Sequence, residues 1–200
     1  MHSWLKNLAK RVFITLSYLF GRSLDLPRTY MKKLILIPLL FLNLNAKTIE
    51  RSGDALLILI PALTFGYSYL QDDYDGQVEL VKSLATTTLS TYALKYATKE
   101  QRPNKEDDHS FPSGHTAITM DSAVYLHKRY GLNVALPAYL GSAWTGYSRV
   151  ESDNHYTHDV LAGAVLGAVS SYYFTTKFKG FEIKPIFGSS GVGLGINKSW

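Results

Sequence analysis

Hydrophobic positions beyond residue 50 gather in runs that have the length and spacing of helices. The most apolar run is Ala55–Leu70, which Asp54 and Asp72 bound. The further runs are Val78–Lys95, Thr116–Tyr130, Leu132–Tyr147 and Tyr156–Phe178. No run holds the roughly 20 uninterrupted apolar residues that a bilayer-spanning helix needs. The pattern therefore predicts an all-α protein, a bundle of about five to six helices seated in or against a membrane, with a wholly soluble bundle as the alternative.

Two glycine patterns refine this prediction. Gly163 and Gly167 lie four residues apart in the last helical run, so they share a face on which a neighbouring helix can approach closely. After that run the period changes, because Phe181–Phe187 and Val192–Ile196 alternate or nearly alternate. The stretch between them, Gly188-Ser189-Ser190-Gly191, has turn chemistry. The C-terminal tail is therefore expected to form a small β-hairpin.

The N-terminal segment differs from the rest in charge. Residues 1–33 carry seven Lys and Arg against one acidic residue, whereas the chain from Lys47 onward carries 14 against 15. Met31-Lys32-Lys33 precedes an uncharged run, LILIPLLFLNLNA, that ends at Ala46. A basic start, a short apolar run and a small residue are typical of a secretory signal, which translation from Met31 would place at the N-terminus. The alternative is an N-terminal anchor made of residues 12–20 and 34–46.

Three segments are therefore expected. Residues 1–46 form a targeting or anchor segment, and the mature protein begins near Lys47. Residues 47–180 form the helical domain, and residues 181–200 form the tail.

Composition narrows the function classes. The chain is 46% hydrophobic with a mean hydropathy of −0.04, too polar for mostly lipid-exposed helices and too apolar for a disordered chain. The nearly neutral body lacks the clustered basic face of a nucleic-acid-binding protein, so no nucleic-acid partner is expected. The absence of cysteine excludes disulfides, zinc-thiolate sites and a cysteine nucleophile.

Three clusters of polar residues carry candidate chemistry. They are Lys95 with Arg102-Pro103, then Pro112-Ser113-Gly114-His115, then Ser148-Arg149 with His155 and Asp159. Together they resemble the signature of the type 2 phosphatidic acid phosphatase (PAP2) superfamily, K-x6-RP, PSGH and SR-x5-H-x3-D, with every position matched. The resemblance covers about a third of the chain. It implies a PAP2/haloperoxidase-like bundle that acts as a metal-independent phosphatase through a phosphohistidine on His155, with no cofactor.

The cations in these clusters suit a phosphate. Phosphoryl transfer requires neutralising charge on three equatorial oxygens, and Lys95, Arg102 and Arg149 supply three positive side chains. Ser113 and Gly114 stand just before a helical run. Their backbone N–H groups, together with the Ser113 hydroxyl, are expected to form an anion cradle at the helix N-terminus.

The histidines suit the chemistry itself. If His155 and Asp159 are both helical they share a face, and the carboxylate can fix the imidazole tautomer and leave the other nitrogen as nucleophile. His115, from a separate helix, can protonate the leaving oxygen and later activate water. The family resemblance implies the same roles. A metal cluster of His155, His158 and Asp159 is the alternative, but a cation there would be redundant beside three basic side chains, so no metal is expected.

The resemblance also implies a substrate class, a phosphorylated lipid of the bacterial envelope: lipid A, undecaprenyl diphosphate, phosphatidylglycerol phosphate or phosphatidic acid. The export signal favours the first two and a site that faces the periplasm on the inner membrane. The membrane is the expected partner, and no oligomeric state is predicted. The alternatives are a soluble periplasmic non-specific acid phosphatase, a vanadium haloperoxidase and a non-catalytic phospholipid-binding protein.

Overall fold

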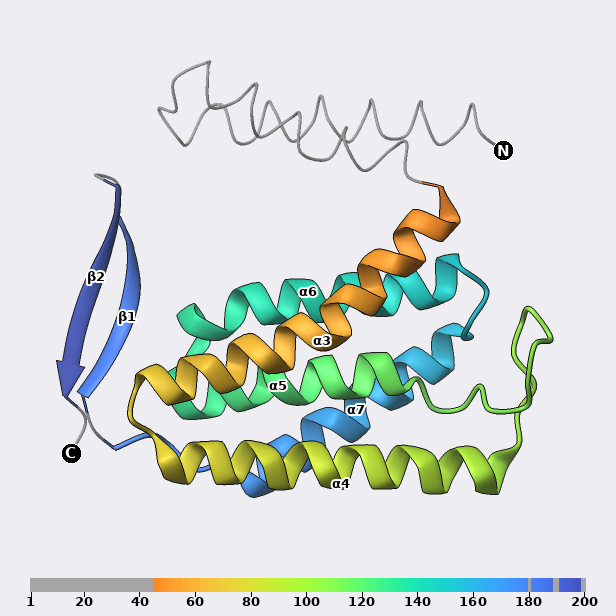
Figure 1. Ribbon diagram of the computed structural model, residues 1–200, viewed down its shortest axis with the longest axis horizontal. Helices are drawn as coiled ribbons and strands as arrows, with labels where there is room; N and C mark the ends of the chain where they lie inside the picture. Colours follow the sequence, from red (N-terminus) through yellow and green to blue (C-terminus); the bar gives the residue numbers. More distant parts are fainter. Residues whose placement is uncertain (1–44, 180, 189–190, 199–200) are drawn as a thin grey trace, which may run out of the picture. The chain divides into compact units, whose positions relative to one another are not determined.

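The computed structural model describes residues 45–179, 181–188 and 191–198 (Figure 1). The predicted targeting segment therefore lies outside the described residues up to residue 44. The described part contains five helices, and the expected all-α bundle is confirmed. The helices are α3 (Ala46–Leu70), α4 (Tyr74–Thr98), α5 (Gly114–Tyr130), α6 (Leu132–Glu151) and α7 (Thr157–Phe174).

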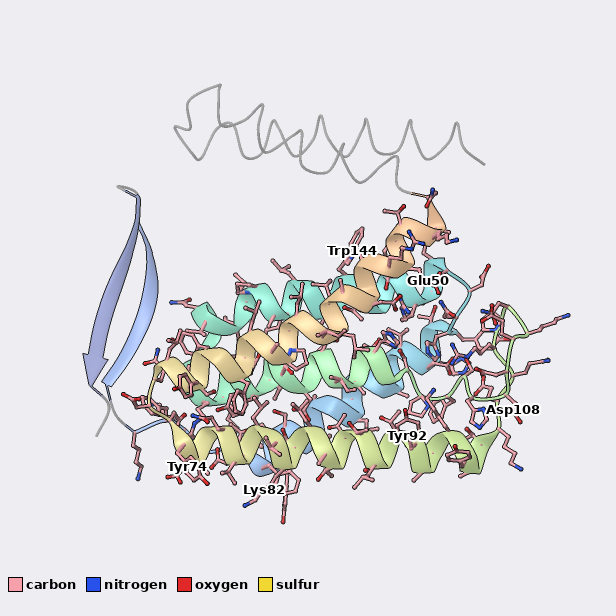
Figure 2. The ribbon with its side chains drawn as sticks, in the orientation of Figure 1. Glu50, Tyr74, Lys82, Tyr92, Asp108 and Trp144 are labelled. Carbon is pink, nitrogen blue, oxygen red and sulfur yellow. The ribbon has the colours of Figure 1, made fainter. Side chains whose placement is uncertain are left out.

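Helix α3 begins at Ala46, well before the start that the apolar run indicated. Asn45 caps it, because its side-chain oxygen accepts hydrogen bonds from the backbone N–H and the hydroxyl of Thr48, both at 2.9 Å. The first two turns are rich in charged residues and do not read as apolar. The earlier start places Glu50 and Asp54 on the helix, at the end of the bundle that carries the candidate site (Figure 2 shows Glu50).

Helix α7 is shorter than expected at both ends. Tyr156 is its N-cap residue, so His155 lies outside the helix, and Thr175 is already extended. The premise that His155 and Asp159 share a helical face is therefore wrong, although the two side chains still meet, as described below.

Helix α5 lies in the middle of the bundle and contacts each of the other four helices. Its tightest neighbour is α7, because the two glycines expected to allow close approach do so. A Cβ on Gly163 would lie 2.3 Å from the carbonyl oxygen of Ser113, and a Cβ on Gly167 would lie 2.0 Å from that of Ala117. Neither position tolerates a side chain without moving the backbone of α5.

The end of the bundle opposite the candidate site is closed by a buried charged network. Arg129 of α5 donates to both carboxylate oxygens of Asp73, to Glu79 and to the carbonyl and hydroxyl oxygens of Thr176. The hydroxyl of Tyr130 donates to the same Asp73 carboxylate. We call these five residues the far-end network. They join the α3–α4 turn, α4, α5 and the segment after α7.

The tail forms the expected hairpin. Strands β1 (Phe181–Gly188) and β2 (Gly191–Lys198) pair antiparallel, from Phe181 opposite Lys198 to Gly188 opposite Gly191.

Among the described helices, α3 alone is long and apolar enough to cross a membrane, judged by length and composition.

Candidate active site

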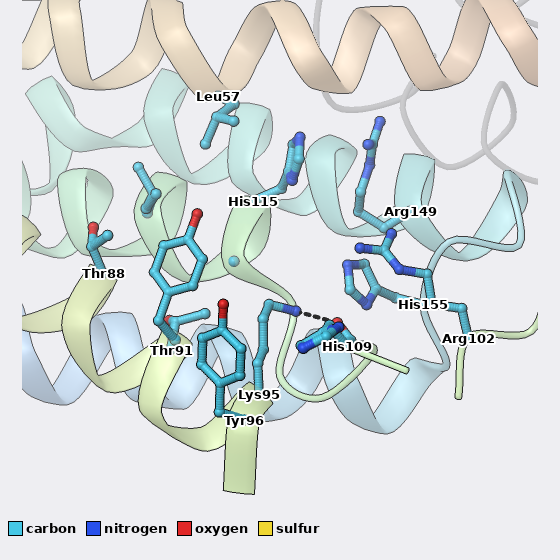
Figure 3. A pocket seen from close by; sticks show the side chains of 13 residues that line it. Leu57, Thr88, Thr91, Lys95, Tyr96, Arg102, His109, His115, Arg149 and His155 are labelled. Atoms are coloured by element: carbon cyan, nitrogen blue, oxygen red, sulfur yellow. Dashed lines mark hydrogen bonds between the residues drawn. The ribbon is translucent and has the colours of Figure 1, made fainter. Parts of the chain in front are cut away.

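A cavity of about 370 Å³ lies where α4 ends and α5 begins, and it collects most of the motif residues (Figure 3). Six of the eight residues proposed from sequence line it: Lys95, Arg102, Gly114, His115, Arg149 and His155. The other two, Ser113 and Asp159, are fully buried next to it. The three sequence clusters therefore meet in one place, although α5 and most of α6 separate them along the chain.

His155 occupies the loop between α6 and α7. Its backbone N–H donates to the carbonyl oxygen of Arg149 at 3.1 Å, and its ring Nδ1 lies 3.5 Å from Asp159 Oδ2. Asp159 is held in turn by the backbone N–H of Tyr156 at 2.9 Å and by the Ser110 hydroxyl at 2.5 Å. The carboxylate is thus fixed on the Nδ1 side of the ring, which leaves Nε2 for chemistry.

The electrostatic setting keeps His155 neutral. Burial, and then the charges of Lys95 and Arg102, lower the pKa of His155 to about 3, against the opposing effect of the Asp159 carboxylate. At neutral pH the ring therefore carries no net charge and has a free lone pair on one nitrogen. That is the form in which a histidine acts as a nucleophile.

Lys95 and Arg102 hold the loop that follows α4 against the cavity. Lys95 Nζ donates to the carbonyl oxygen of His109 at 2.6 Å (Figure 3). It also donates to the carbonyl oxygen of Ser110 at 3.2 Å. Burial, and then the charge of Arg102, lower the pKa of Lys95 to about 8. Arg102 Nε pairs with the half-exposed Asp107 carboxylate at 2.7 Å. His109 also lines the cavity.

Asp54 joins His115 to Arg149, a role that the sequence did not reveal. Its Oδ1 accepts from Arg149 Nη1 at 2.8 Å and lies 3.1 Å from His115 Nε2. Burial, and then Arg149, lower the pKa of His115, while Asp54 acts to raise it. Each histidine of the site therefore has its own carboxylate, Asp159 for His155 and Asp54 for His115.

The sequence also missed Ser110, Glu50 and Asn154. The carbonyl oxygen of Glu50 accepts from Arg149 Nη2 at 2.5 Å, and its carboxylate accepts from the side-chain amide of Asn154 at 2.8 Å. These partners lie far apart along the chain, so no spacing rule indicates them. The cap residue Ser113 uses its backbone N–H to donate to the Asp159 carbonyl at 3.0 Å, and its hydroxyl lies 3.1 Å from that of Thr116. In this arrangement Ser113 ties α5 to α7, and Gly114 is the member of the pair that faces the cavity.

The described bundle thus brings one buried histidine, a second histidine and three basic side chains together at one cavity, an arrangement that suits a tetrahedral oxyanion. A family model described as the PAP2 superfamily matches residues 77–182, more than half of the sequence. The chain belongs to this superfamily.

Two further comparisons concern individual proteins. Over 78 residues the chain is 36% identical to the lipid A 1-phosphatase of Porphyromonas gingivalis, a match that covers 38% of this chain and 18% of that relative. The matched segment thus spans less than a fifth of the relative's length. A solved structure, LpxE of Aquifex aeolicus, aligns with 65% of this chain and 93% of its own, with a TM-score of 0.47 and 21% identity.

Proposed function

We propose that the protein is a phosphatase that hydrolyses a lipid phosphate or lipid diphosphate through a phosphohistidine on His155. The observation that carries the proposal is the neutral, buried imidazole of His155 held between a fixed carboxylate and a cluster of basic side chains. Lys95, Arg102 and Arg149 would hold the non-bridging oxygens of the phosphate, and the attacking nitrogen and leaving oxygen would lie in line through phosphorus.

In the first step Nε2 of His155 attacks phosphorus and the bond between phosphorus and the leaving oxygen breaks. His115 gives its proton to that oxygen from the imidazolium form, which Asp54 favours against the opposing effects of burial and Arg149 on the pKa. In the second step neutral His115 takes a proton from water, and the hydroxide attacks the phosphohistidine. The nitrogen–phosphorus bond breaks and inorganic phosphate leaves. The dephosphorylated lipid alcohol, or the monophosphate from a diphosphate, is the other product.

Apolar surface around the cavity supports a lipid as the substrate. The cavity reaches from the cations to Leu57 of α3 and to Thr88 and Tyr92 of α4, so it extends between these two helices. Large apolar side chains are exposed along several helices, among them Ile58, Leu63, Leu70, Leu89, Leu140, Leu161, Val165 and Val169. A head group in the cavity, with its chains between the helices and in a bilayer, would use both features.

Lipid A is the first candidate among the envelope lipids, because the matched relative is a lipid A 1-phosphatase. Undecaprenyl diphosphate is the second, since a signal-like segment before residue 47 would bring the site to the periplasmic face, where both lipids are exposed. The proposal therefore includes a place at the inner membrane with the cavity open to the periplasm.

Phosphate release from a panel of substrates tests the proposal. The full chain in detergent is given lipid A, undecaprenyl diphosphate, phosphatidic acid and p-nitrophenyl phosphate, with His155→Ala as the control. We expect kcat/KM for the best lipid to exceed that for p-nitrophenyl phosphate by at least about tenfold, which needs only about 1.4 kcal/mol of additional transition-state binding. Equal efficiency on both, with the protein recovered in the soluble periplasmic fraction, would favour the acid phosphatase instead.

A further inference from the structure

Outside the cavity, three possible metal ligands meet at the start of α7. They are Glu100, just after α4, and His158 and Asp159 in the first turn of α7, and their ligand atoms all lie within 4.8 Å of one another. His158 Nε2 lies 2.8 Å from Glu100 Oε1 and 3.1 Å from Asp159 Oδ1. Neither Glu100 nor His158 lines the cavity. The side chains of the cluster therefore meet the catalytic apparatus at Asp159, and the backbone carbonyl of Glu100 accepts from the backbone N–H of Ser110 at 2.9 Å.

The hydrogen bonds in this cluster leave one carboxylate oxygen without a partner. In a neutral imidazole His158 Nε2 carries at most one proton, and the geometry directs it to Glu100. Asp159 Oδ2 accepts from Ser110 and Tyr156, but Oδ1 is buried and accepts no hydrogen bond from any described residue. A buried carboxylate oxygen that accepts no hydrogen bond, beside a second carboxylate, is costly unless a cation or donor satisfies it. Oδ1 points toward the other two ligands.

We propose that Glu100, His158 and Asp159 form an inhibitory binding site for a divalent transition metal of the Zn²⁺ type. One imidazole and two carboxylates are ligands that Zn²⁺ takes, with a fourth position left for water. The ring of His158 stacks on that of Tyr156, with centroids 5.4 Å apart and planes 7° apart, which orients the imidazole. His158 is 59% exposed, so an ion can enter from solvent.

A metal ion at this site would inhibit the enzyme because it binds the same Asp159 carboxylate that orients His155. Asp159 Oδ2 faces Nδ1 of His155, and a metal on Oδ1 would draw the negative charge of the same carboxylate away from the imidazole. His155 would then lose the group that stabilises positive charge on its ring when Nε2 attacks phosphorus. This consequence rests on the proposed phosphatase function, whereas metal binding itself does not.

The test measures binding and activity separately. The full chain is purified in detergent, stripped with EDTA and titrated with Zn²⁺ by calorimetry, and phosphate release is followed in parallel. Glu100→Gln and His158→Gln remove ligands without touching the cavity. His127→Gln is the matched control, because His127 contacts Tyr139 away from the cavity. Circular dichroism checks that each variant is folded.

We expect the wild type and His127→Gln to bind one Zn²⁺ and to lose activity as the site fills. Glu100→Gln and His158→Gln should bind at least about tenfold more weakly, need correspondingly more Zn²⁺ for inhibition, and keep their metal-free kcat/KM within about twofold. Absence of binding to the wild type, or equal affinity in all four proteins, would overturn the site. Activity that EDTA abolishes and Zn²⁺ restores would overturn both the inhibition and the metal-independent mechanism. Zn²⁺ binding as expected, without phosphatase activity on any substrate, would leave the site standing and reject the proposed function alone.

Discussion

The two ends of the bundle bury similar charged residues but pair them differently. At the far-end network, Arg129 is 5% exposed and directs its donors to two carboxylates and to Thr176. At the cavity, Lys95 donates to two neutral carbonyl oxygens, and Arg102 pairs with a carboxylate that is 43% exposed. Arg149 is 4% exposed, but its carboxylate partner Asp54 is 51% exposed and its other acceptors are the neutral oxygens of Glu50 and Ser148.

This difference separates a structural charge cluster from a functional one. A buried arginine that is paired with largely buried carboxylates does not release them for a ligand, and its pairs hold neighbouring segments together. Cations that surround a cavity and meet neutral or solvent-exposed partners can exchange those partners for the oxygens of a phosphate. The predictions below test whether the two ends differ in this way.

The largest effect is expected at the nucleophile. His155→Ala should reduce turnover below detection while the protein remains folded, because no other described side chain in the cavity has the same setting. Asp159→Asn should lower kcat by about 10²–10⁴-fold, since the imidazole loses its orienting carboxylate. Phosphate release under saturating substrate measures both. His127→Ala is the control, and near wild-type activity in His155→Ala would exclude the phosphohistidine mechanism.

A pair of arginine substitutions compares the two ends directly. Arg129→Ala should lower the free energy of unfolding by about 3–5 kcal/mol, because it leaves the Asp73 carboxylate buried without its partner. Arg149→Ala should cost less stability than Arg129→Ala, because its carboxylate partner Asp54 is half exposed, and it should lower kcat/KM by about 10²–10³-fold, because it removes a donor to the developing charge. Thermal unfolding and phosphate release on both variants decide this. Similar stability losses in the two variants would contradict the comparison.

The sequence predicted features that are local along the chain and missed those that depend on tertiary contacts. The helices, and the residues that meet at the cavity, were predictable because apolar periodicity and the motif spacings are local along the chain. The start of α3 was not, because Lys47, Glu50, Arg51 and Asp54 make its first turns polar. This part of the chain is helical because Glu50 and Asp54 bond to Arg149 of α6 and to Asn154 in the loop before α7. These contacts are tertiary, so the local sequence around residue 50 does not predict them.

Two details of the site depended on exact backbone conformation. The interval of four between His155 and Asp159 suggested one helical face, yet the contact arises because Asp159 caps the helix that begins after His155. The cluster at His158 was considered from the sequence with His155 as its third member. The structure supplies Glu100 instead, from a loop more than fifty residues away.

Acid unfolding should distinguish the two ends by pH. The pKa of His155 is lowered to about 3 from 6.5, so between these values the unfolded chain binds more protons and stability falls as the pH falls. Burial acts to raise the pKa of Asp73, but hydrogen bonds from Arg129 and Tyr130 outweigh burial and lower this pKa. The contribution of Asp73 to the free energy of unfolding is therefore lost only below about pH 3.8. Melting temperatures from pH 7 to 3 should fall less steeply from 6.5 to 4 in His155→Ala than in the wild type. Parallel curves for the two proteins would contradict this assignment.

The smallest effect concerns the basic side of the pH profile. Because the pKa of Lys95 is about 8, the free enzyme loses this positive charge as the pH rises through 8. The value of kcat/KM reports the ionisation of the free enzyme, so it should fall about tenfold for each pH unit above 8 if the phosphate needs the charged lysine. Arginine keeps its charge throughout this range, so Lys95→Arg should remove the decline.

The kcat/KM of Lys95→Arg at pH 7 should be lower than that of the wild type, because a planar guanidinium does not reproduce the point contacts of Nζ with His109 and Ser110. His127→Gln should keep the wild-type profile, which controls for the loss of a titrating side chain elsewhere. A decline above pH 8 that persists in Lys95→Arg would assign the basic limb to another group and would place Lys95 with the structural charges, like Arg129 at the opposite end.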